Sequence, residues 1–117
     1  MTIMEDKTEV WTAVCSSADI PAEWGVAALI GDRQIALFRT FDGTLYAIGN
    51  QDPFSGAYVL SRGIVGSRGD LPTVASPLHK QVFDLRTGRC LDSEDIAVPS
   101  YAVRERDDVV EVRIEAT

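Results

Sequence analysis

The amino-acid sequence predicts an all-β fold, a sandwich or partly open barrel with a small loop-rich lobe at one end. Apolar residues alternate with polar ones in short runs, and pairs such as Asp42-Gly43 separate these runs as hairpin turns do. A stretch with five glycines and two prolines, residues 49–72, interrupts this rhythm. The chain has 117 residues, of which 45% are apolar, which is ordinary for one domain. The many short strands predict a low helix content.

The first half of the chain is expected to contain strands at residues 11–14, 26–30, 34–39 and 44–48. A turn or a single helical turn is expected at residues 18–21, where Pro21 ends the segment. Gly31-Asp32 and Asp42-Gly43 are typical of the tight turns that join antiparallel strands. These elements therefore predict consecutive hairpins.

The second half returns to strands after the glycine-rich stretch, in which residues 58–62 fit either a short helix or a loop. Strands are expected at residues 73–75, 82–85 and 90–91, with a turn at Thr87-Gly88. A final hairpin joins residues 101–106 and 109–114 through Asp107-Asp108. Its last strand places Val110, Val112 and Ile114 on one face, which predicts a half-buried edge strand.

We expect a polar N-terminal arm, residues 1–10, and a single domain, residues 11–117, whose lobe spans about residues 49–91. The net charge of −7 argues against nucleic acid or an anionic membrane as a partner, because both require a basic surface. No apolar targeting region begins the sequence, and Cys15 and Cys90 lack paired spacing. The two cysteines are therefore expected to be reduced packing groups in a cytoplasmic protein.

Three stretches carry the most specific pattern in the chain. They are Asn50-x-Asp52-Pro53-Phe54-x-Gly56-Ala57, Ser61-Arg62-Gly63-Ile64-Val65-Gly66, and Ser76-Pro77-Leu78-His79-Lys80-Gln81-x-Phe83-Asp84-Leu85-x-Thr87-Gly88-x-Cys90-Leu91. Together they resemble the small subunit of the cytoplasmic NAD(P)H-dependent assimilatory nitrite reductase. The resemblance extends over residues 11–112 and implies a Rieske-like β-sandwich or partly open barrel that lacks the ligands of the [2Fe–2S] cluster.

The resemblance also implies a partner, the large catalytic subunit, which carries FAD, a [4Fe–4S] cluster and sirohaem. That subunit performs the six-electron reduction of nitrite to ammonium with NADH or NADPH, and the small subunit supports it without an active site of its own. No glycine-rich dinucleotide motif occurs at a strand-to-helix turn here. The chain itself is therefore expected to hold no cofactor and no catalytic residue.

The ligand positions of a Rieske cluster are identified through the same resemblance. Such proteins read Cys-Pro-His in the first segment and Cys-Pro-Leu-His in the second, with two cysteines on one iron and two histidines on the other. The corresponding positions here hold Asp52, Phe54, Ser76 and His79. Because thiolates hold iron–sulfur clusters, this set predicts that no [2Fe–2S] cluster and no other metal is bound.

Three interpretations of these positions stay open. Asp52 and His79 offer two ligands to a single metal, fewer than stable sites use. Asp52, Ser76 and His79 match the residue set of a hydrolytic triad, although no oxyanion hole or cleft can be assigned. The interpretation we favour is structural: Phe54 fills the volume of the cluster, and the three polar residues hydrogen-bond across the two segments.

In Rieske proteins the cluster-bearing tip is the docking surface. By this resemblance, Pro53, Phe54, Arg62, His79 and Lys80 are expected to face the large subunit, although Arg62 and Lys80 also fit ordinary solvated charges. Two alternative functions remain at this point: a Rieske-type electron-transfer ferredoxin and a free-standing Rieske-like binding module.

Overall fold

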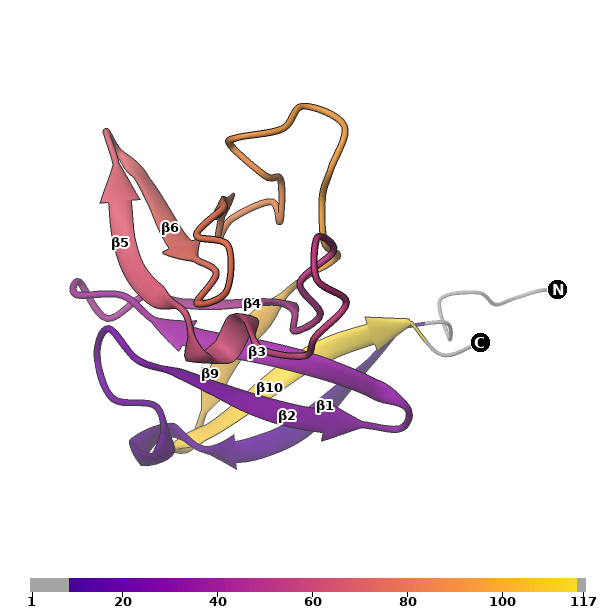
Figure 1. The fold of residues 1–117 in the computed structure, drawn as a ribbon. Helices are drawn as coiled ribbons and strands as arrows, with labels where there is room; N and C mark the ends of the chain where they lie inside the picture. The colour runs from indigo at the N-terminus through magenta and orange to yellow at the C-terminus, as the bar shows by residue number, and fades with distance from the viewer. Residues whose placement is uncertain (1–8, 116–117) are drawn as a thin grey trace, which may run out of the picture.

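The computed structural model describes residues 9–115, which confirm the all-β prediction. Figure 1 shows their arrangement. The strands are β1 (Glu9–Ser16), β2 (Gly25–Ile30), β3 (Arg33–Arg39), β4 (Leu45–Gly49), β5 (Ile64–Arg68), β6 (Leu71–Ala75), β7 (Val82–Asp84), β8 (Ser100–Tyr101), β9 (Val103–Arg106) and β10 (Val109–Glu115). The helical turns are the short 3₁₀ helices η2 (Ser17–Asp19) and η3 (Leu60–Arg62).

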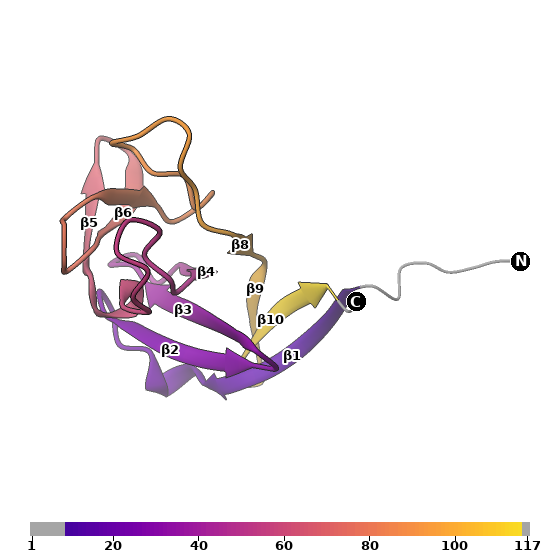
Figure 2. The ribbon, with the colours of Figure 1, turned by 45° about the vertical axis from the view of Figure 1, so that its right-hand side comes forward.

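The strands form three antiparallel sheets. The terminal sheet has the order β1-β10-β9, the central sheet β2-β3-β4-β8, and the lobe sheet β5-β6-β7. Figures 1 and 2 show the lobe sheet and the terminal sheet on opposite sides of the central sheet. The lobe expected at one end of the domain is therefore present, and it contains a small sheet as well as loops.

Strand β3 is the centre of the molecule, because both of its faces are buried. Ile35 and Leu37 pack toward the terminal sheet, whereas Ala36 and Phe38 pack toward the lobe, and all four are 0% exposed. Four consecutive apolar residues are the pattern of a strand covered on both sides. One strand thus connects the two hydrophobic cores.

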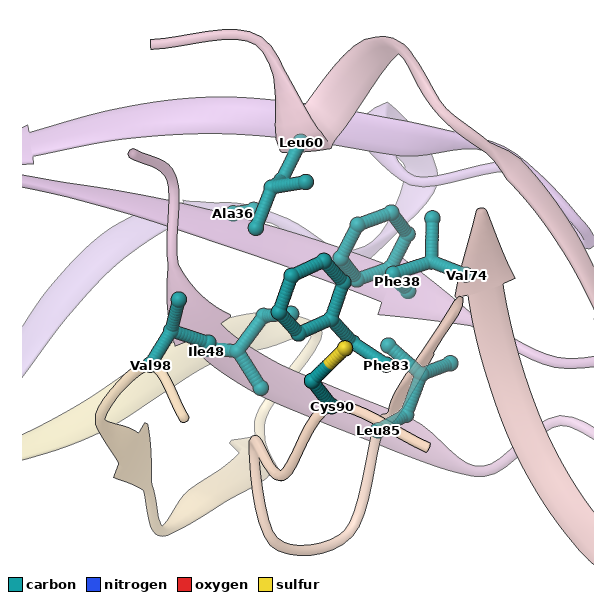
Figure 3. Packing of buried hydrophobic residues seen from close by; sticks show 9 residues of the cluster. All are labelled: Ala36, Phe38, Ile48, Leu60, Val74, Phe83, Leu85, Cys90 and Val98. Atoms are coloured by element: carbon teal, nitrogen blue, oxygen red, sulfur yellow. The ribbon is translucent and has the colours of Figure 1, made fainter. Parts of the chain in front are cut away.

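The core beneath the lobe lies between the central sheet and the loops that follow it. Figure 3 shows the ring of Phe83 in the middle of this cluster, with the sulfur of Cys90 beside it. Cys90 is buried there, and Cys15 packs partly buried against the other core. Both are free thiols, which confirms their expected packing role.

Strand β10 corrects one prediction, because it is the middle strand of its sheet and not an edge strand. It pairs with β1 on one side and with β9 on the other. The predicted face is confirmed, since Val110, Val112 and Ile114 are buried. Alternation reveals which face is covered, whereas strand neighbours depend on pairing with β1, about a hundred residues earlier in the sequence.

The glycine-rich stretch corrects a second prediction. Residues 64–68, expected to be loop, form β5 and pair with β6 around a turn in which Gly69 has a φ of 62°. Residues 90–91, expected to be a strand, contribute only an isolated bridge between Phe83 and Cys90. Glycine lowers strand propensity without forbidding a short strand that is paired along its whole length.

The ends of the predicted domain are partly outside the described residues. Residues 1–8 of the expected arm lie outside them, and Glu9 and Val10 begin β1.

No helix among residues 9–115 is long and apolar enough to cross a membrane.

The turn after β7 requires a glycine. Gly88 has a φ of 81°, donates its N–H to the Asp84 carbonyl, and accepts a hydrogen bond from the Val98 N–H. A Cβ atom at this position would overlap the backbone carbonyl group of Val98. Gly69 also has a positive φ, but an added Cβ would meet no atom within 4 Å.

We expect Gly88→Ala to destabilise the fold more than Gly69→Ala. Both variants incur the left-handed backbone cost of about 1–2 kcal/mol. Only Gly88→Ala must also displace the backbone at Val98, which should cost at least about 2 kcal/mol more. Urea unfolding of both variants measures the difference, and equal losses would contradict the close packing at this turn.

Candidate functional site

Two loops of the lobe, residues 50–57 and 76–81, share one backbone design, and we call them the loop pair. In the first, the Asp52 carbonyl accepts from the Gly56 N–H at 2.7 Å, and the Asp52 N–H donates to the Ala57 carbonyl at 2.8 Å. In the second, the Ser76 carbonyl accepts from the Lys80 N–H at 3.0 Å, and the Ser76 N–H donates to Gln81 at 2.9 Å. The two loops are therefore equivalent, with Asp52 and Ser76 in matching positions.

The equivalence extends to the neighbouring residues. A proline follows both Asp52 and Ser76. The backbone N–H of Phe54 donates to Asp52 Oδ1 at 2.8 Å, and in the same way the backbone N–H of Leu78 donates to Ser76 Oγ at 3.3 Å. Gly56 and Lys80, each four residues on, have positive φ values of 78° and 64°. Proline fixes the start of each turn, and the left-handed residue closes it.

A hydrogen bond between the two matching side chains joins the loops. The Ser76 hydroxyl donates to Asp52 Oδ2 at 2.6 Å, and the two residues are 1% and 0% exposed. This confirms the predicted cross-loop contact for Asp52 and Ser76. The prediction is wrong for His79, which is exposed and has no side-chain hydrogen bond or ion pair within the described residues.

The carboxylate of Asp52 is stabilised in its charged form. Burial alone raises the pKa of Asp52, but hydrogen bonds from the Ser76 hydroxyl and from the backbone N–H groups of Phe54 and Ser55 outweigh it. The net effect is a pKa below the ordinary value of 3.8. Asp52 is therefore an ionised acceptor at neutral pH, which makes the bond from Ser76 charge-assisted.

Phe54 occupies the second of the four ligand positions, and it lies at the surface of the core. Its ring centroid is 6.3 Å from that of Phe83, with the rings tilted by 57°. The side chain nevertheless remains 38% exposed. The ring therefore covers Phe83 and also faces solvent, and its role in filling the volume of a cluster stays a prediction.

The residues at these positions do not fit a [2Fe–2S] cluster. They supply one carboxylate already bound to Ser76, one hydroxyl and one outward histidine, whereas the cluster needs thiolates. Cys90 is enclosed in the core and Cys15 lies on β1. Among residues 9–115, no three His, Cys, Asp or Glu side chains gather as a metal site would require.

A hydrolytic triad is also inconsistent with this geometry. The Ser76 hydroxyl donates a hydrogen bond directly to the Asp52 carboxylate, whereas a catalytic triad places a histidine between the serine and the aspartate. His79 lies in the same loop as Ser76 but is exposed to solvent. The loops therefore bring Asp52 and Ser76 together without the intervening histidine that nucleophilic catalysis needs.

Asn50 has a structural role that the sequence pattern alone did not reveal. Its side-chain oxygen accepts from the Ser61 N–H at 2.7 Å, and its carbonyl accepts from the Leu60 N–H at 3.0 Å. It thereby attaches η3, and with it the exposed Arg62, to the first loop. The sequence signal for this role was an asparagine that directly follows an apolar strand. A polar side chain that is buried at such a position needs hydrogen-bond partners.

Comparison with known proteins agrees with this fold and loop arrangement. The family described as a Rieske-like [2Fe–2S] domain matches residues 10–113. The chain therefore belongs to the family of Rieske-like domains. Its four ligand positions depart from the cluster-binding set that gives this family its name.

Within this family the chain groups with the small subunits of nitrite reductase. It is 43% identical to the nitrite reductase (NADH) small subunit of Escherichia coli over 104 residues, which are 88% of this chain and 96% of that protein. A protein assigned as an NADH-dependent nitrite reductase small subunit from Mycobacterium tuberculosis has a crystal structure with 45% identity and a TM-score of 0.88. That match covers 93% of this chain and 98% of the other.

A third relative has a different organisation. The nitrite reductase [NAD(P)H] large subunit of Klebsiella oxytoca is 47% identical over 94 residues, which are 80% of this chain but only 10% of that protein. A domain similar to this chain is therefore part of a much longer polypeptide there. The ferredoxin of carbazole 1,9a-dioxygenase from Nocardioides aromaticivorans, at 24% identity and a TM-score of 0.75, shares the fold.

Ser76→Ala should destabilise the protein, because it removes a donor from a buried carboxylate. We expect a loss of about 2 kcal/mol at neutral pH. The matched variant His79→Ala, in the same loop, should change stability by less than about 0.5 kcal/mol. The pKa of Asp52 in the folded state lies below its ordinary value of 3.8, so ionised Asp52 stabilises the folded protein at pH values above 3.8. This stabilisation is lost as the pH falls through the folded-state pKa.

The penalty of Ser76→Ala should accordingly shrink as the pH is lowered below 3.8. Denaturant unfolding of the wild type and both variants between neutral and acidic pH tests this. A penalty that does not change with pH would show that Asp52 is not the group that Ser76 stabilises.

Proposed function

We propose that this chain acts as the non-catalytic small subunit of an NADH-dependent nitrite reductase, and that its loop pair binds the large subunit. The observation that carries the proposal is the 43% identity with the Escherichia coli small subunit over 96% of that protein's length. Similarity over the whole domain, and not over one motif, supports a shared role. In that role the large subunit reduces nitrite to ammonium, and this chain supports it by binding.

The Klebsiella oxytoca protein supports the choice of partner. A domain 47% identical to this chain occupies 10% of a large subunit there. Two components that exist as one polypeptide in one relative, and as a separate small subunit in others, are expected to work in contact. A small subunit requires a large one, and we assign that position to the nitrite reductase large subunit.

The loop pair has the properties of a docking surface. Pro53, Phe54, His79 and Lys80 are exposed on loops whose backbones are closed by their own hydrogen bonds, and Arg62 follows on η3. Preformed loops lose little conformational entropy on binding. Lys80 and Arg62 are cations on a chain with a net charge of −7. They therefore favour the docking orientation that places them against an acidic region of the large subunit.

The cofactors in this proposal belong to the large subunit. FAD, a [4Fe–4S] cluster and sirohaem are assigned there, and none to this chain, because its ligand positions carry no thiolate. The complex is assigned to the cytoplasm, where NADH is available and thiols such as Cys15 and Cys90 remain reduced.

Protein purified without oxygen should contain no stoichiometric iron and show no visible thiolate-to-iron absorption band. The reason is the donor set of Asp52, Phe54, Ser76 and His79. Metal analysis and absorption spectroscopy measure both quantities. Two iron atoms per chain with a visible band would refute the assignment of a cluster-free subunit.

Charge and shape changes in the loop pair should weaken binding to the large subunit. We expect Phe54→Asp and Lys80→Glu each to reduce the affinity by about tenfold or more. Arg106→Glu, a charge reversal at an exposed arginine on β9, serves as the matched control and should change the affinity by less than about threefold. Calorimetric titration of the purified large subunit provides the affinities.

The same proteins test the function directly. Nitrite-dependent NADH oxidation by the large subunit should be higher with wild-type chain than without it, and the Phe54→Asp and Lys80→Glu variants should restore less at equal concentration. Activity that is the same with and without this chain, together with no detectable binding, would reject the proposed function.

A further inference from the structure

We propose that a second surface, beside the loop pair, binds an extended segment of the same large subunit. This segment carries apolar side chains between an acidic end and a basic end. The surface consists of two adjoining hollows between β2, the β3–β4 turn and the β5–β6 hairpin, and we call it the side groove. This inference rests on the proposed function and identifies a contact that the loop pair does not provide.

The two hollows share lining residues. One has a volume of about 580 Å³, and Trp24, Arg62 and Ile64 are among the residues that line it. The other has a volume of about 330 Å³ and contains Phe41 and Asp70. Glu23 and Val65 line both of them. Together they cover residues of β2, the β3–β4 turn and the β5–β6 hairpin, and a surface spread over three elements suits an extended segment better than a compact small molecule.

The side groove carries an unusual share of exposed apolar surface. Trp24 is 67% exposed, Ile64 71% and Phe41 85%. Among the large apolar side chains with described exposure, only Leu29, at 70%, reaches a similar value. Scattered single residues of this kind need no explanation, but three along one depression mark a protein interaction surface. Tryptophan in particular is enriched among residues that dominate binding energy.

The charges of the side groove are divided between its two hollows. Arg62 lines only the hollow that contains Trp24 and Ile64, and its guanidinium forms no ion pair or hydrogen bond within the described residues. Asp42 and Asp70 line only the other hollow, and Glu23 lines both. This division favours a segment with a carboxylate next to Arg62 and a cation next to the aspartates. It therefore sets the direction in which the segment lies.

The floor of the side groove is preformed. A Cβ atom on Gly25 would overlap the Ser61 carbonyl oxygen, and one on Gly63 would overlap the Ala75 carbonyl oxygen. β2, η3 and β6 therefore approach one another at backbone contact, which leaves little freedom for the hollow to collapse. A rigid groove binds with a smaller entropy loss than a flexible one.

The side groove shares Arg62 with the docking surface that we propose for the loop pair. Arg62 lies at the end of η3, and η3 is attached to the first loop through the hydrogen bonds that Asn50 accepts from Leu60 and Ser61. Arg62, which we assign to the docking surface of the loop pair, is thus also a lining residue of the side groove. This shared residue is the reason for assigning the groove to the large subunit and not to a second copy of this chain.

The test compares two groove variants with a matched control. Ile64→Ser and Trp24→Ser should each weaken binding of the purified large subunit by about tenfold. Leu29→Ser removes an equally exposed apolar side chain outside the groove and should stay within about twofold of the wild type. Because all three side chains lie at the surface, their melting temperatures and circular dichroism spectra are expected to match the wild type. Calorimetric titration supplies the affinities.

Each outcome decides the matter. If the wild type binds and both groove variants bind equally well, the side groove is rejected while the proposed function stands. If the wild type does not bind the large subunit, the proposed function fails and this inference fails with it. If light scattering shows a dimer of the wild type that Ile64→Ser converts to a monomer, a second copy occupies the groove and the large subunit does not.

Discussion

The burial of β3 on both faces is the constraint on which the rest of the structure depends. Ile35 and Leu37 require the terminal sheet to cover them, and Ala36 and Phe38 require the lobe. Neither half can be removed without exposing a fully apolar strand face, which costs about 25 cal/mol for each Å². The lobe is therefore held by the core beneath it, so its loops keep their positions although their residues no longer suit a metal cluster.

The equivalence of the two loops explains how the lobe closes at its outer end. Asp52 and Ser76 occupy matching places, so their side chains point at one another, and 2.6 Å separates the two oxygens. A buried carboxylate is costly unless hydrogen bonds compensate it, and here a hydroxyl and backbone N–H groups do so. Each of the two residues therefore constrains the other, and apolar residues at both positions would remove the bond that ties one loop to the other.

Most of the strands could be predicted because they leave local signals: alternation identified the buried face of Val110, Val112 and Ile114. The pairing of Asp52 with Ser76 was predicted from the family resemblance, which assigns both residues to ligand positions of one cluster. The position of β10 between β1 and β9 could not be derived, since it depends on a partner distant in the chain. His79 was misplaced because spacing does not determine which way a side chain turns. Trp24, Phe41 and Ile64 each appear as isolated apolar residues, and only the fold brings them to one surface.

The need for a second contact surface follows from interface size. A standard specific interface covers about 800 Å² on each partner, which is roughly an eighth of the 6695 Å² of accessible surface here. Such an interface uses about 20–30 residues on each side, whereas the loop pair, residues 50–57 and 76–81, contains fourteen. In the Klebsiella oxytoca relative, covalent connection raises the effective concentration of the domain, so weak contacts suffice. A separate chain lacks that help and must obtain its affinity from area, and the apolar depression next to Arg62 is where this fold supplies it.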